Sequence, residues 1–123
     1  MTSWITICDT CKRENWDPSV QPLTDGEILA GLIESRAEAA GVKTRRVSCM
    51  MGCARACNVA VQGPGKLAYV LGTFEPTAEN AKAIVQYAAL HQGSENGQVP
   101  YRQWPQAVKG HFTTRMAPLP DLD

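Results

Sequence analysis

The side chains with the clearest chemistry are the five cysteines, which fall into two groups. Cys8 and Cys11 form a C-x2-C pair, whereas Cys49, Cys53 and Cys57 form a C-x3-C-x3-C run. Two thiolates that lie two or three residues apart on one tight turn can bind a single metal centre, and two such turns complete a four-thiolate site. The spacing therefore predicts a metal centre or a reactive thiol pair rather than scattered buried cysteines.

A four-thiolate site leaves one of the five cysteines over. Cys57 leads directly into a predicted strand, where a buried thiol behaves as a small hydrophobic side chain. If its segment were helical, however, Cys57 would share one face with the two cysteines before it and could replace either of them. The ligands that we expect are Cys8, Cys11, Cys49 and Cys53. Cys57 is the alternative ligand, which could replace Cys49 or Cys53.

Two further uses of the same thiols stay open. Zinc takes four thiolates in its commonest closed site and needs no redox role. A C-x2-C pair beside a strand–helix–strand pattern is also typical of thioredoxin-like dithiol enzymes. Two features argue against the dithiol enzyme. The long loop between Cys11 and Thr24 is not expected to place Cys8 at a helix N-terminus, and Asn58, rather than a proline, precedes the third strand.

The strands that must position these cysteines are predicted from hydrophobic patterns and turn residues. Residues 4–8 and 42–47 are rich in β-branched side chains, and each segment runs into one of the cysteine groups. Residues 58–62 and 67–71 are two further β-rich segments, joined by a Gly/Pro turn that is typical of a hairpin. The sequence therefore predicts four strands, two of which end at cysteines.

Two helices are predicted between and after these strands. The first covers about 25–40 and starts at a capping box, and the second follows Thr77 and ends at Gly93. From there the composition shifts to Gly, Ser, Asn, Gln and Pro. We expect one domain over residues 1–92 and a Pro/Gly-rich extension over 93–123.

Four apolar residues of this extension recur at a spacing of four, which is compatible with one short docked helix. They are Trp104, Val108, Phe112 and Met116. Otherwise we expect an irregular tail.

Charge and hydropathy exclude several classes of partner. Twelve Lys and Arg balance twelve Asp and Glu, which argues against nucleic acid. No segment approaches the roughly 18 apolar residues of a membrane helix, and the N-terminus lacks the pattern of a secretory signal. We therefore expect a cytoplasmic protein with neither a nucleic-acid nor a membrane partner. Reducing conditions there favour ligands or reactive thiols over disulfides.

No residue pattern indicates hydrolytic or group-transfer catalysis. The sequence contains no P-loop, no dinucleotide glycine signature and no Ser/His/Asp constellation. His91 and His111 stand alone, without the spacing of metal ligands. We expect a protein that is not an enzyme, and we assign no catalytic residue.

The cysteine motifs resemble those of a known group of proteins. The order of elements, with a cysteine pair after the first strand and C-x3-C after the second, resembles the thioredoxin-like 2Fe-2S ferredoxins. The Cys49–Cys57 run with the Asn-Val-Ala-Val that follows it, and the Gly63-Pro-Gly-Lys66 turn, are more closely similar to a family of small bacterial predicted metal-binding proteins of unknown function. The resemblance covers about residues 4–92.

This resemblance carries expectations about fold and function. It implies an α/β thioredoxin-like ferredoxin fold, with a mixed four-stranded sheet, two main helices and an irregular C-terminal tail. It also implies a 2Fe-2S cluster on Cys8, Cys11, Cys49 and Cys53, electron transfer to a redox partner protein, and the option of a homodimer. The first cysteine pair is more closely spaced than in the ferredoxins, which keeps zinc or another cluster type open. A metal-handling role linked to cobalamin biosynthesis is the alternative, since genes of that pathway sometimes neighbour those of the small family.

Overall fold

The computed structural model describes residues 2–51 and 55–120, and the elements within these ranges follow the order strand, helix, strand, hairpin, helix, strand. Two single-turn 3-10 helices, η2 and η3, precede the last strand. The elements are β1 (Trp4–Cys8), α1 (Asp25–Ala37), β2 (Lys43–Val47), β3 (Val59–Gln62), β4 (Ala68–Leu71), α2 (Ala78–Gly93), η2 (Tyr101–Gln103), η3 (Gln106–Val108) and β5 (Phe112–Met116).

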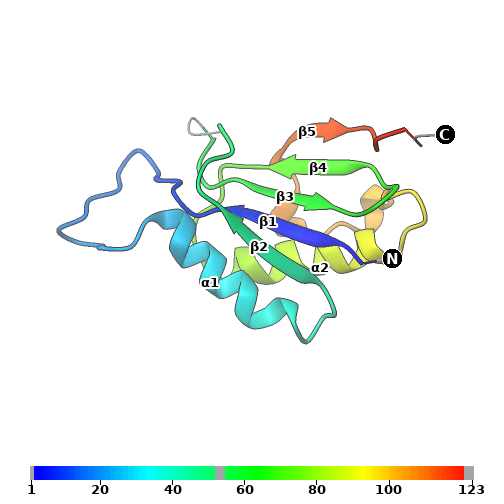
Figure 1. The fold of residues 1–123 in the computed structure, drawn as a ribbon. Coiled ribbons are helices and arrows are strands. Elements are labelled where there is room, and N and C mark those ends of the chain that lie inside the picture. Colours follow the sequence, from blue (N-terminus) through cyan, green and yellow to red (C-terminus); the bar gives the residue numbers. More distant parts are fainter. Residues whose placement is uncertain (1, 52–54, 121–123) are drawn as a thin grey trace.

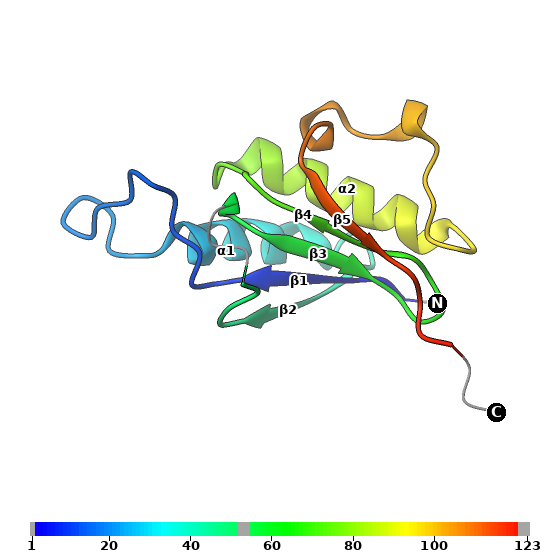
Figure 2. The same ribbon diagram turned by 90° about the horizontal axis from the view of Figure 1, so that it is seen from above.

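The strands form one mixed sheet in the order β2-β1-β3-β4-β5. β1 pairs with β2 in parallel, whereas the other three pairings are antiparallel. Both long helices lie on the same face of this sheet, as the two ribbon views show (Figures 1 and 2). The predicted α/β class with two main helices is thus confirmed.

The strand count differs from the prediction, because the described residues form five strands rather than four. Phe112–Met116 pairs with β4 as an edge strand, where we expected an irregular tail or a short helix. The β-branched pair Thr113 and Thr114 suits a strand, and an uncovered β4 would have left a row of unpaired backbone groups. The apolar spacing of four is therefore not helical. Trp104 and Val108 lie in or beside the 3-10 helices instead.

A compact apolar core lies between the two long helices and the sheet. α1 begins at the predicted capping box, in which Thr24 Oγ1 accepts from the Glu27 amide at 3.0 Å and a Glu27 carboxylate oxygen accepts from the Thr24 amide at 3.0 Å. Its buried face includes Leu29 and Ile33. Within residues 2–51 and 55–120, no helix is long and apolar enough to cross a membrane.

The C-terminal extension packs on this core through aromatic side chains. The Phe112 ring lies edge-on to those of Tyr69 and Tyr87, with centroids 5.7 and 5.2 Å away, and it also contacts Trp104 at 4.4 Å. Val108 is fully buried. The division into a domain over residues 1–92 and an extension over 93–123 stays a prediction.

Replacing Phe112 by alanine tests how firmly β5 is attached. We expect Phe112→Ala to lower the free energy of unfolding by about 2–3 kcal/mol, somewhat less than a fully buried phenylalanine, because the ring is partly exposed. Leu119→Ala, at a position 91% exposed, is the matched control and should change it by less than about 0.5 kcal/mol. Urea denaturation measures both. Equal effects would show that β5 adds nothing to the core.

Candidate metal centre

The two cysteine loops start side by side at one edge of the sheet. Cys8 is the last residue of β1 and pairs with Val47, the last residue of the parallel strand β2. Beyond that pair, the Asp9 amide donates to the Val47 carbonyl at 3.0 Å, and Thr10 Oγ1 donates to the Ser48 carbonyl. The first loop is thereby tied to the segment that leads into Cys49.

Cys8 and Cys11 form a buried thiol pair, each only 2% exposed. Their side chains are hydrogen-bonded to each other, and Cys8 also accepts from the backbone amides of Thr10 and Met50. Burial opposes ionisation of the Cys8 thiol, but the hydrogen bonds from Cys11, Thr10 and Met50 outweigh it and lower its pKa. Burial, together with donation to Cys8, raises the pKa of Cys11 to about 11. Cys8 is therefore the more acidic thiol of the pair.

The first turn of α1 closes tightly on the backbone of this pair. The Gly26 amide donates to the Cys11 carbonyl at 2.9 Å, and Thr24 Oγ1 donates to the Asp9 carbonyl. A Cβ atom on Gly26 would lie 2.1 Å from the Cys8 carbonyl oxygen, so only glycine fits there. The expectation that the long loop keeps Cys8 away from the helix start is thus wrong.

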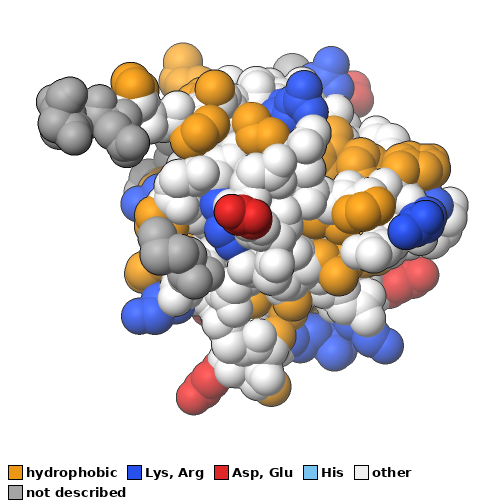
Figure 3. Space-filling view, turned by 90° about the vertical axis from the view of Figure 1, so that its right-hand side faces the viewer, with side chains coloured by type: hydrophobic (Ala, Val, Ile, Leu, Met, Phe, Trp, Pro, Cys, Tyr) orange, Lys and Arg blue, Asp and Glu red, His pale blue; other side chains and the backbone are white. Residues whose placement is uncertain are grey.

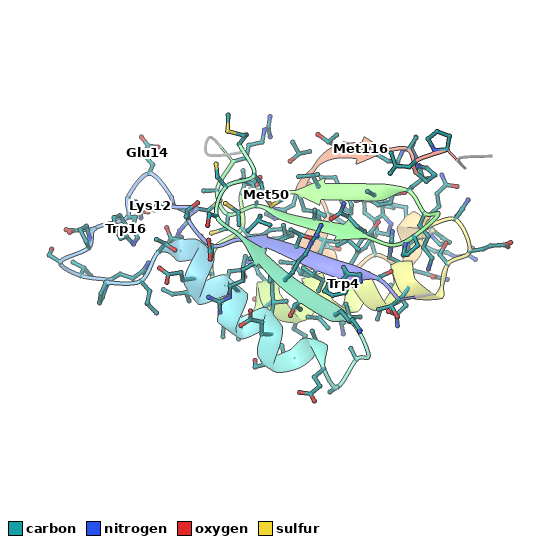
Figure 4. The ribbon with its side chains drawn as sticks, viewed as in Figure 1. Trp4, Lys12, Glu14, Trp16, Met50 and Met116 are labelled. Atoms are coloured by element: carbon teal, nitrogen blue, oxygen red, sulfur yellow. The ribbon has the colours of Figure 1, made fainter. Side chains whose placement is uncertain are left out.

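The loop between Cys11 and Thr24 explains that error, because it extends outward and returns (Figures 1 and 4). Trp16 Nε1 donates to the Leu23 carbonyl at 2.8 Å, and this hydrogen bond joins the outgoing and returning arms of the loop. Its labelled residues Lys12, Glu14 and Trp16 lie well away from Trp4 and Met116 at the other end of the molecule (Figure 4). Loop length in sequence therefore did not set the distance between its ends.

A buried carboxylate fixes Arg13, two residues beyond Cys11. Asp25, which is not exposed, accepts from the Arg13 amide at 2.6 Å and from the Arg13 guanidinium at 3.3 Å. Gln21 donates to the same carboxylate at 2.9 Å. Burial opposes ionisation of Asp25, but these hydrogen bonds outweigh it and lower its pKa. The charged carboxylate therefore holds both arms of the loop at the start of α1.

Asn58 is a site residue, although its place before the third strand indicated only the absence of a proline there. Its side-chain amide donates to Cys11 Sγ at 3.5 Å, and its carbonyl accepts from the Cys8 amide at 3.2 Å. Contacts with both cysteines arise only in the folded chain, because Asn58 lies 47 residues beyond Cys11. No local pattern in the sequence predicts these contacts of Asn58 with the two cysteines.

The remaining cysteines lie in different surroundings. Cys49 is exposed, and its sulfur accepts from the Met51 amide at 3.3 Å. Cys53 lies outside the described residues. Cys57 is fully buried, and burial, followed by the nearby negative charge of Asp25, raises its pKa to about 12. Cys57 is thus a core side chain that also lies near enough to Cys8 and Cys11 for their charges to raise its pKa.

Among residues 2–51 and 55–120, no three Cys, His, Asp or Glu side chains are grouped so that they could hold a metal ion. The described part of the structure brings together two of the expected ligands, Cys8 and Cys11. It places a third, Cys49, on the neighbouring loop. The complete set of four requires Cys53, so it stays a prediction.

The donors that surround these sulfurs fit a thiolate-bound iron–sulfur cluster or a thiolate-bound metal ion. N–H groups of Thr10, Met50, Met51 and Asn58 are directed at three of the expected ligand sulfurs, as is usual where thiolates are stabilised. In addition, Asp9 Oδ1 and Arg13 Nε are buried with no hydrogen-bond partner among the described residues. Unpaired buried polar atoms are rare in a purely structural setting.

A surface cavity of about 380 Å³ lies at the other end of β1. Its lining includes Trp4, Arg45, Pro64 and Met116, and Arg45 Nε donates to Thr6 Oγ1 at 2.7 Å. Figure 3 shows this end of the molecule, where hydrophobic, basic and acidic side chains are interspersed. Because Trp4 and Cys8 are the two ends of β1, this cavity is separate from the thiols.

The contact at Gly26 yields a test with a control in the same helix. We expect Gly26→Ala to lower the free energy of unfolding by about 2 kcal/mol or more, because the added methyl group must displace the Cys8 backbone. Gly31→Ala has open space around its Cβ and should instead stabilise the helix by about 1 kcal/mol. Urea denaturation compares the two. A Gly26→Ala variant as stable as Gly31→Ala would contradict the packing of α1 on Cys8.

Comparisons with known proteins identify the fold and the family. A thioredoxin-like [2Fe-2S] ferredoxin from Aquifex aeolicus superposes with a TM-score of 0.57 over 95% of this chain and 94% of that chain, at 14% sequence identity. This likeness confirms the thioredoxin-like fold. A search of the curated proteins found no match. Residues 5–118 match the model of a family described as protein of unknown function, DUF1636, so the chain belongs to the DUF1636 family.

Proposed function

We propose that this protein binds a 2Fe-2S cluster through Cys8, Cys11, Cys49 and Cys53 and transfers single electrons to a partner protein. The observation that carries the proposal is the hydrogen-bonded Cys8–Cys11 pair, beside which β2 delivers the Cys49 loop. The solved relative in fold is itself a [2Fe-2S] ferredoxin. When bound, such a cluster supplies one-electron chemistry, with a potential that depends on hydrogen bonds to its sulfurs and on exposure to solvent.

The two cysteine loops differ in their exposure to solvent. The first loop holds its thiols out of water, because Cys8 and Cys11 are nearly inaccessible and their backbone is fixed on α1. The second loop faces solvent, because Cys49 is exposed and the Met51 side chain is 89% exposed. We propose that the redox partner docks on this second loop, where it approaches the thiols most closely.

The basic side chains near the thiols are partly engaged within the chain. Arg13 is paired with Asp25, and Arg46 forms a two-point ion pair with Glu34 at 2.7 and 2.8 Å. Lys12, by contrast, is exposed and lies 4.8 Å from the centre of the Trp16 ring. Arg55, which lies six residues beyond Cys49, is also exposed and has no ion pair among the described residues. A partner at the second loop therefore meets a free cation as well as the apolar Met51.

A second candidate function, dithiol–disulfide exchange by Cys8 and Cys11, is favoured by one observation. The same hydrogen bond that lowers the pKa of Cys8 raises that of Cys11, which is the division of roles in an exchanging pair. Exchange would use these two thiols and leave Cys49 and Cys53 without a role. A zinc site would use all four thiols without electron transfer.

Single cysteine variants separate these functions. After anaerobic purification, we expect Ser substitutions of Cys8, Cys11, Cys49 and Cys53 each to reduce bound iron and acid-labile sulfide by at least about tenfold, since even the loss of an outer-shell partner costs that much affinity. Cys57→Ala is the matched control and should keep the wild-type content, because this thiol is buried in the core.

The opposite outcomes are equally specific. An unchanged visible spectrum in Cys11→Ser would contradict the ligand assignment. Stoichiometric zinc without sulfide, lost in all four serine variants, would replace electron transfer by a structural or metal-handling role. Disulfide reductase activity that survives Cys49→Ser but not Cys8→Ser would favour the dithiol enzyme.

A further inference from the structure

Asn58 contacts both cysteines of the first loop, Cys11 through its side chain and its backbone amide and Cys8 through its backbone carbonyl. Its Nδ2 donates to Cys11 Sγ at 3.5 Å, and its carbonyl accepts from the Cys8 amide at 3.2 Å. The residue is only 2% exposed. A buried N–H donor is thus held against a predicted ligand sulfur, in a place that bulk water does not reach.

The surroundings of Asn58 hold its side chain in place. Asn58 immediately precedes β3, and its backbone continues the pairing of β3 with β1 through the Cys8 amide. On the other side lies Gly72, at which a Cβ atom would come within 3.2 Å of Asn58 Oδ1 and 2.6 Å of the Arg55 carbonyl. The close approach of Gly72 leaves the amide little room to turn away from Cys11.

Packing alone does not explain an asparagine at this position. Burying an amide costs about 1–3 kcal/mol unless its donors and acceptors are paired, whereas leucine has nearly the same shape and no such cost. The N–H donors to Cys8 are the backbone amides of Thr10 and Met50, and the Asn58 backbone amide donates to Cys11. Any residue would supply these backbone donors, and they remain in a variant of Asn58. The Asn58 side-chain amide gives Cys11 a donor that depends on the identity of a side chain, and the Thr10 hydroxyl, 3.7 Å from Cys8 Sγ, is the comparable contact of Cys8.

We infer that Asn58 is a positioning residue that sets the reduction potential of the bound cluster through its N–H···S hydrogen bond to Cys11. This inference rests on the proposed function. Adding an electron increases the negative charge on the ligand sulfurs, so an N–H donor stabilises the reduced form more than the oxidised form and raises the potential. Removing the donor therefore lowers the potential.

The test is a spectroelectrochemical titration of the full-length protein, purified anaerobically, as wild type and as Asn58→Leu. Loss of one such hydrogen bond should make reduction about tenfold less favourable, which for a one-electron couple is a shift of about 59 mV to more negative potential. Iron and sulfide contents are measured on the same samples, so that cluster loss is seen separately from a change in potential.

Asn80→Leu is the matched control. The Asn80 side-chain amide also donates to a single acceptor, the Glu75 carbonyl at 3.0 Å, and the residue is half-buried in the first turn of α2. We expect this variant to keep the wild-type potential. A second variant, Asn58→Ala, removes the donor without adding bulk and should shift the potential in the same direction as Asn58→Leu.

The outcomes distinguish failure of the inference about Asn58 from failure of the proposed function. A loaded wild type whose potential is unchanged in both Asn58 variants would overturn the inference and leave the proposed function standing. Loss of the cluster in both variants, with Asn80→Leu still loaded, would make Asn58 a structural residue and also overturn it. A wild type that binds no iron and no sulfide would refute the proposed function, and the inference with it.

Discussion

The parallel pairing of β1 with β2 is the constraint on which the candidate metal centre depends. Parallel strands end at the same edge of a sheet, so the segments that follow them begin side by side. Here the pair Cys8 and Val47 closes the ladder, and the Asp9 amide continues it at 3.0 Å from the Val47 carbonyl. Antiparallel pairing would have carried the two cysteine groups to opposite edges. The single parallel pair in the described sheet is therefore what makes a site shared by both loops geometrically feasible.

The first turn of α1 adds the second support, and it makes the two halves of the site unequal. Gly26 and Thr24 bind the backbone of the first loop, and Asp25 holds Arg13, two residues after Cys11. The second loop has the exposed thiol of Cys49 instead. A rigid, water-excluding half beside a solvent-facing half suits electron transfer, because one side fixes the ligands while the other stays within reach of a partner.

Local patterns were enough to predict the parts of the fold that are encoded locally. Strands that run into cysteines and the Thr24 to Glu27 capping box are properties of neighbouring residues, and both are present. The fifth strand was missed because Phe112–Met116 becomes a strand by pairing with β4, a contact that no nearby residue signals. Gly26 and Asn58 were missed as site residues for the same reason, since each acts on cysteines that only folding brings near. The four-ligand set stays a prediction because Cys53 lies outside the described residues.

Cluster binding can be decided by counting iron, acid-labile sulfide and zinc on anaerobically purified wild-type protein and recording its visible absorption spectrum before and after dithionite. We expect a brown protein with about two irons and two sulfides per chain, as a 2Fe-2S cluster requires, whose colour is bleached by the reductant. A colourless protein with stoichiometric zinc and no sulfide would contradict it and reassign the same thiolates to a closed zinc site.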